Sequence, residues 1–121
     1  MKSVHTALAL LICSAVAGCA AYPGAPVDWQ HGAKRGTVAE IYDANTPPER
    51  IPACLAGSSP ADLTQHHYVR LSYHHVRAMH TEVAELPPGV SVQMGEMVEL
   101  WPADCAKGAL SRITRVMPAV P

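Results

Sequence analysis

The chain has 121 residues, which is enough for one small domain. Nine lysine and arginine residues stand against ten aspartate and glutamate residues, so the net charge is close to zero. This balance provides no strong overall field to steer the protein to nucleic acid or to acidic lipid, and it excludes function classes that depend on such a field.

The N-terminal end has the pattern of an export signal. Lys2 supplies a positive charge, an apolar run extends from Ala7 to about Ala17, and small residues follow. About 12 apolar residues span only about 18 Å of helix, whereas the hydrocarbon core of a bilayer is about 30 Å thick. The pattern therefore predicts a signal peptide over residues 1–18 in preference to a membrane-spanning helix.

Two cleavage sites compete at the end of this signal. The stretch Ala15-Val16-Ala17 fits an ordinary site with small residues, which would release a soluble secreted protein. The stretch Val16-Ala17-Gly18-Cys19 resembles the bacterial lipobox. That resemblance implies that the Cys19 thiol receives a diacylglyceryl group, that cleavage occurs just before Cys19, and that the new amine receives a fatty acyl chain such as palmitate.

The lipobox favours a lipid-anchored protein, with the soluble secreted protein and an uncleaved membrane segment as the alternatives. Ala20 follows the cysteine, and in Gram-negative lipoproteins an aspartate there resembles an inner-membrane retention signal. Its absence implies the outer membrane, with the protein on the periplasmic face. Several acyl chains would hold it firmly, because each buried CH₂ group contributes about 0.8 kcal/mol.

Cys54 and Cys105 are the two cysteines that remain after processing. An even pair in a small exported domain predicts a disulfide, because the compartment is oxidising. The bond would close a loop of about 52 residues, which the chain-entropy model values at about 4 kcal/mol. A redox or metal pair is the alternative, and it requires closer cysteines with further ligands nearby.

The mature chain divides into a tether and one β-domain. Residues 19–35 contain prolines and glycines without apolar periodicity, which predicts a lipidated cysteine and a flexible tether that Trp29 anchors to the domain. Residues 36–121 predict an all-β domain, a small five- or six-stranded barrel of OB-like or SH3-like type. Strands are expected over residues 36–42, 68–74, 81–86, 90–93, 97–101 and 109–117, and a short helical turn is expected after Ser59, with Pro60 at its first position.

The stretch from residue 68 to residue 86 predicts a hairpin. Val69, Leu71 and Tyr73 share one face of the first strand, and Ala84 and Leu86 are expected on the same inner face of the return strand. The connection between the two strands contains neither Asn nor Gly, the residues that usually form tight hairpin turns.

Three stretches in this order resemble the C-terminal β-barrel region of SlyB-type outer-membrane lipoproteins, the glycine-zipper family. They are "GTVAEI", "YVRLSYHHV" and "PPGVSVQMGEMVEL". The chain differs from that family in one large respect, because a proline-rich loop with Cys54 stands where the glycine-rich zipper is found. The resemblance therefore implies a fold and a compartment, and it implies no activity.

Histidines are the most suggestive candidates for ligand binding. His66 and His74 would lie about 26 Å apart along an extended strand, which is too far for one metal ion. Across the turn, His75 and His80 can approach each other, and Glu82 could complete a metal site with them. Solvated histidines on a strand are the alternative to this periplasmic metal- or small-ligand-binding module.

The sequence contains no nucleophile elbow, phosphate loop, dinucleotide fingerprint or zinc-protease motif, so we expect no enzyme. We expect no nucleic-acid partner, because there is little aromatic interleaving among the arginines. The leading hypothesis is a non-enzymatic outer-membrane lipoprotein, without a cofactor beyond its covalent lipid, that contacts another envelope component. Five carboxylates are expected on a solvated β surface: Glu82, Glu85, Glu96, Glu99 and Asp104.

Overall fold

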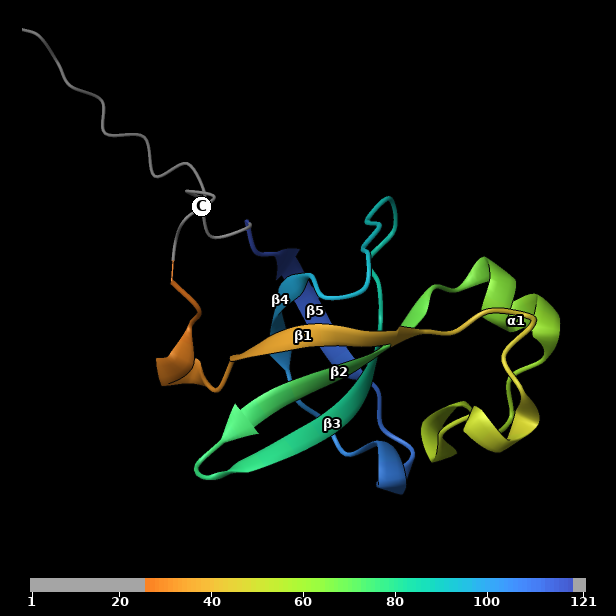
Figure 1. The fold of residues 1–121 in the computed structure, drawn as a ribbon, viewed down its shortest axis with the longest axis horizontal. Coiled ribbons are helices and arrows are strands. Elements are labelled where there is room, and N and C mark those ends of the chain that lie inside the picture. Colours follow the sequence, from red (N-terminus) through yellow and green to blue (C-terminus); the bar gives the residue numbers. More distant parts are fainter. Residues whose placement is uncertain (1–25, 119–121) are drawn as a thin grey trace, which may run out of the picture.

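The computed structural model describes residues 26–118, which form a closed barrel of five strands (Figure 1). The strands are β1 (Lys34–Ile41), β2 (Tyr68–His75), β3 (Ala78–Glu85), β4 (Met97–Trp101) and β5 (Ser111–Val116). The connections hold the α-helix α1 (Pro60–Gln65) and the 3-10 turns η1 (Trp29–His31), η2 (Pro48–Arg50), η3 (Ala53–Leu55) and η4 (Cys105–Lys107). The prediction of a small all-β barrel is confirmed. Within residues 26–118, no helix is long and apolar enough to cross a membrane.

The strands follow the order β1-β2-β3-β5-β4 around the barrel, and β4 pairs with β1 to close it. Neighbouring strands are antiparallel except β3 and β5, which are parallel and meet through the pairs Ala84↔Ser111 and Glu85↔Arg112. This closed order with one parallel contact corresponds to the OB-like type, one of the two barrel types predicted.

The strand predicted over residues 90–93 does not form. These residues belong to the irregular connection between β3 and β4, where Gly89 and Gly95 both adopt positive φ and turn the chain on either side of them. Val90 and Val92 still pack against the barrel core. The alternating apolar residues of this stretch are therefore partly buried, although the stretch pairs with no strand.

Alternation along the strands produces the barrel core. Its buried members are Val38, Val69, Leu71, Tyr73, Ala84, Leu86, Val98, Leu100 and Ile113. The inner face predicted for the hairpin is therefore confirmed. Gly36 makes room for this packing, because a Cβ atom on it would lie 3.2 Å from Cδ2 of Leu100.

A second apolar cluster lies on the outside of β2 and β3, under the long connection between β1 and β2. Its buried members are Tyr42, Leu55, Leu63, Tyr68, Val83 and Cys105. Ser59 caps α1 by accepting from the Asp62 N–H, and Asp62 in turn accepts from the Ser59 N–H. The predicted short helix with Pro60 at its first position is thus confirmed.

The far half of the β2–β3 hairpin extends beyond the barrel as an arm. The β1–β2 pairing runs from Ile41↔Val69 to Thr37↔Ser72, and the β3–β5 contact involves only Ala84 and Glu85. Residues 73–80, which we call the hairpin arm, therefore pair only with each other in these ladders. In Figure 1 the arm is the green end of the hairpin, pointing away from the strands that close the barrel.

Val76 at the end of the arm has a φ of 58°, a conformation that is unfavourable for a β-branched residue. We expect Val76→Gly to raise the free energy of unfolding by about 1 kcal/mol, because about 1–3 kcal/mol of strain is relieved and about 0.5–1 kcal/mol of chain entropy is lost. Urea denaturation measures the change. Arg77→Gly is the matched control, and it should destabilise, because no positive φ is recorded there.

Residues 26–33 pack against the barrel ahead of β1, so the structured part of the chain begins before Gly36. Val27 is 3% exposed and Ala33 is fully buried, whereas Trp29 is 52% exposed. The expectation that Trp29 anchors this segment is wrong, since Val27 and the backbone of Asp28 make the contacts instead. Cys19 and the predicted signal lie outside the described residues.

Candidate functional site

The two connections that carry ligands in OB-fold barrels, those between β1 and β2 and between β4 and β5, are joined in this protein by a disulfide. Cys54 lies in η3 in the first connection, and Cys105 begins η4 in the second. Their sulfur atoms are bonded, with the Cα atoms 4.8 Å apart, which confirms the predicted pairing. The bond holds the long connection against the outer face of β2 and β3, and the second apolar cluster fills that part of the face.

An open groove of about 600 Å³ lies within the β1–β2 connection. Its lining is mainly apolar, with Pro47, Pro48, Ile51 and Leu63 among the described residues, and polar groups such as Asn45 and Ser58. Those described lining residues include no histidine, carboxylate or lysine that could act as a general base or a charged ligand contact. The groove is therefore better suited to holding an apolar group of matching shape than to acid–base catalysis.

The hairpin arm brings two of the predicted metal ligands together. The rings of His75 and His80 lie on one face of the arm with centroids 5.9 Å apart, and His80 also stacks on Tyr73 at 5.4 Å. Glu82, the third predicted ligand, instead accepts a hydrogen bond from the Cys105 N–H at 2.9 Å. No group of three or more His, Cys, Asp or Glu residues within residues 26–118 could hold a metal ion.

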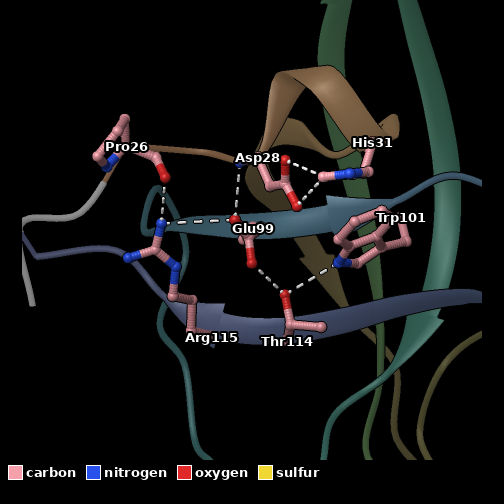
Figure 2. A network of polar contacts seen from close by, with 7 residues as sticks. All are labelled: Pro26, Asp28, His31, Glu99, Trp101, Thr114 and Arg115. Carbon is pink, nitrogen blue, oxygen red and sulfur yellow. Dashed lines mark hydrogen bonds and ion pairs between the residues drawn. The ribbon is translucent and has the colours of Figure 1, made fainter. Parts of the chain in front are cut away.

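A network of polar groups surrounds Glu99 on the outer face of β4 (Figure 2). The Glu99 carboxylate accepts from the Asp28 N–H at 3.1 Å and from the Thr114 hydroxyl at 2.5 Å, and it lies 3.4 Å from Nη2 of Arg115. The same Arg115 nitrogen donates to the Pro26 carbonyl at 2.8 Å. Glu99 is therefore the point where β4, β5 and the N-terminal segment are joined, and we call these contacts the Glu99 network.

Trp101 and His31 extend the network along the surface. Nε1 of Trp101 donates to the Thr114 hydroxyl at 3.1 Å, and the Arg112 guanidinium lies 5.2 Å from the Trp101 ring centroid. His31 lies 2.8 Å from the Asp28 carboxylate, which stabilises the turn η1 at its exposed side. Figure 2 shows Trp101, Thr114 and His31 arranged around Glu99 between β4, β5 and the N-terminal segment.

Glu99 is only 8% exposed, so the expectation of a solvated carboxylate is wrong for this residue. Burial by itself would raise the pKa of Glu99, but the hydrogen bonds from Thr114 and Asp28 and the nearby Arg115 outweigh it and lower the pKa. Sequence reasoning missed this site because a glutamate alternating with Val98 and Leu100 has the pattern of any outward-facing strand residue.

Comparisons with known proteins provide no further assignment. No family model, no curated protein and no solved structure matches the chain.

Proposed function

We propose that this protein is a non-enzymatic lipoprotein of the bacterial envelope, held at the periplasmic face of the outer membrane through Cys19. Its small β-barrel contacts another envelope component. The observation that carries the proposal is the stretch Val16-Ala17-Gly18-Cys19, which lies at the end of a short apolar signal and only seven residues before the first described residue, Pro26.

Two features of the barrel support this proposal. The Cys54–Cys105 disulfide suits an oxidising compartment such as the periplasm. The described fold includes residues 26–33, and Pro26 follows Cys19 by seven positions, with six residues between them, so the chain from Cys19 to Pro26 reaches at most about 25 Å. A short connection of this kind suits a domain that works close to the surface to which it is attached.

The mass of the mature N-terminal peptide tests the proposal. The full chain is produced in a Gram-negative host, and membrane and soluble fractions are digested and analysed separately. We expect a peptide that begins at Cys19 and carries three acyl chains, found in the outer-membrane fraction. A peptide beginning at Gly18, with an unmodified Cys19 and in the soluble fraction, would overturn the lipid anchor.

A second candidate function is the binding of a divalent transition metal by His75 and His80. The ring contact at 5.9 Å favours it, because two imidazoles and water molecules form a weak site for Cu²⁺, Ni²⁺ or Zn²⁺. Glu82 is engaged with η4, because its Oε2 accepts a hydrogen bond from the Cys105 N–H.

The metal site predicts a change in thermal stability. We expect Ni²⁺ at 100 times its dissociation constant to stabilise the protein by about 2.7 kcal/mol, seen as a higher melting temperature by circular dichroism. His80→Ala should abolish the shift. The matched control is His67→Ala, because His67 is also an exposed histidine but lies outside the arm. Equal shifts in both variants would show that the metal binds elsewhere.

A further inference from the structure

The hairpin arm exposes apolar side chains on a part of the fold that no other described segment covers. Val76 is 86% exposed and Met79 is 56% exposed, and the whole stretch from His74 to Thr81 is exposed. An exposed valine and an exposed methionine at the end of a projecting hairpin lower solubility and do not contribute to the core. Apolar side chains in such a place indicate an interaction surface.

The backbone of the arm provides an independent sign of function. Asn, Asp or Gly would relieve the strain at position 76, yet a β-branched and nearly fully exposed valine occupies it. The fold itself gains nothing from this side chain, because it packs against no core. A strained residue that contributes nothing to folding points to a role in binding.

The N-terminal segment lies at the same end of the barrel as the arm. The antiparallel pair Thr37↔Ser72 places Lys34, where β1 begins, toward His75, where β2 ends. Figure 1 shows η1 and the arm projecting on the same side of the molecule. Trp29 in η1 is 52% exposed, so this end carries three of the exposed large apolar side chains: Trp29, Val76 and Met79.

The charges at this end favour an anionic surface. The arm contains Arg77 and three histidines and no carboxylate, and Arg35 is exposed at the start of β1. The neighbouring acidic side chains are already engaged: Asp28 contacts His31, and Glu82 accepts from the Cys105 N–H. Glu99, which stands opposite Arg35 in the β1–β4 ladder, accepts from the Asp28 N–H and the Thr114 hydroxyl. A tryptophan beside exposed apolar and basic residues is the composition that favours the interface between water and lipid.

We propose that the hairpin arm and Trp29 form a face that docks on a phospholipid surface containing anionic headgroups. The proposed orientation rests on the proposed lipid anchor, because the chain from Cys19 to Pro26 spans at most about 25 Å and Pro26 belongs to the segment that carries Trp29. β2 continues for three residues beyond Ser72, from Tyr73 to His75, so the arm projects about 10 Å, and this length lies within that reach. Docking would fix the barrel's orientation and turn the groove of the β1–β2 connection toward other components.

The test uses the mature chain with Cys19→Ser, exported with a cleavable signal, so that no acyl chain contributes to binding. Binding to vesicles of phosphatidylethanolamine and phosphatidylglycerol at a 3:1 ratio is measured by sedimentation, together with tryptophan emission. We expect binding about tenfold tighter than to phosphatidylcholine vesicles, and a blue shift of the emission. The shift should disappear in Trp29→Phe, even at lipid concentrations where that variant sediments with the vesicles.

Val76→Asp and Met79→Asp should each weaken vesicle binding about tenfold. Aspartate tolerates positive φ better than valine, so Val76→Asp should remain folded, which circular dichroism checks. Met94→Asp is the matched control, because Met94 is 60% exposed in the β3–β4 connection, away from the arm, and it should bind as the parent does.

Three outcomes would overturn the docking face: unchanged vesicle binding in both arm variants, a Trp29 emission that does not move, or a concentration-dependent dimer that Val76→Asp dissolves. The last outcome would assign the arm to a second copy of the chain. Because the assay uses an acyl-free chain, its failure is distinct from the absence of an acylated Cys19 peptide, which bears only on the anchor.

Discussion

Replacing both Cys54 and Cys105 with serine should lower the free energy of unfolding by about 4 kcal/mol. The disulfide joins residues 51 positions apart, and opening this loop returns a large conformational entropy to the unfolded chain. A small domain is stable by only about 5–15 kcal/mol, so this loss removes much of the margin. Urea denaturation followed by circular dichroism measures it.

The parent protein under reducing conditions is the control for this substitution. It should unfold at the same urea concentration as the double variant, because both lack the cross-link and differ only in the sulfur atoms. A difference of less than about 1 kcal/mol between oxidised parent and double variant would contradict the prediction. It would mean that the second apolar cluster holds the β1–β2 connection without help from the bond.

Glu99→Ala should destabilise the protein by about 3 kcal/mol. The substitution removes a buried carboxylate and leaves the Asp28 N–H, the Thr114 hydroxyl and the Arg115 guanidinium without their shared acceptor. We also expect the N-terminal segment to lose its attachment, so that amide hydrogens of residues 27–33 exchange faster than in the parent.

Glu49→Ala is the matched control for Glu99→Ala. Glu49 is an exposed glutamate in η2, and its replacement should change the free energy of unfolding by less than about 0.5 kcal/mol. Equal effects of the two substitutions would show that the Glu99 network contributes no more than an ordinary surface charge.

The lowered pKa of Glu99 predicts how the network depends on pH. A carboxylate with a lower pKa in the folded state than in the unfolded state stabilises the fold fully above its ordinary value of 4.5. That contribution is lost as the pH falls through the folded-state pKa. We therefore expect the stability difference between the parent and Glu99→Gln to shrink as the pH falls below about 4.5. A constant difference from pH 7 to pH 3 would contradict this assignment.

The barrel core could be predicted from the sequence because alternation decides which side of a strand is apolar. Val69, Leu71 and Tyr73 occupy every second position of β2, and all three are buried in the barrel. The helix α1 was predictable for a similarly local reason, since Ser59 and Pro60 have strong preferences at a helix start. The pairing of Cys54 with Cys105 could be predicted because two cysteines remain after the expected processing and the expected compartment is oxidising.

The same reasoning failed where a second segment covers a strand from outside. Glu99 and Glu82 have the pattern of solvated residues, yet one holds the N-terminal segment and the other holds the Cys105 amide. Residues 90–93 have the pattern of a strand, yet the glycine turns beside them leave no partner strand to pair with.

The sequence by itself determined the inner face of each strand, the start of the helix and the cysteines that form the cross-link, because each depends on neighbouring residues or on counting. The tertiary structure decided which outward residues are covered, that His75 approaches His80, and that the hairpin arm extends past the barrel with Val76 exposed. Those features depend on how many residues each strand pairs with its neighbours before the neighbouring strand ends. That length is set by the packing of segments distant in the chain, which local patterns do not encode.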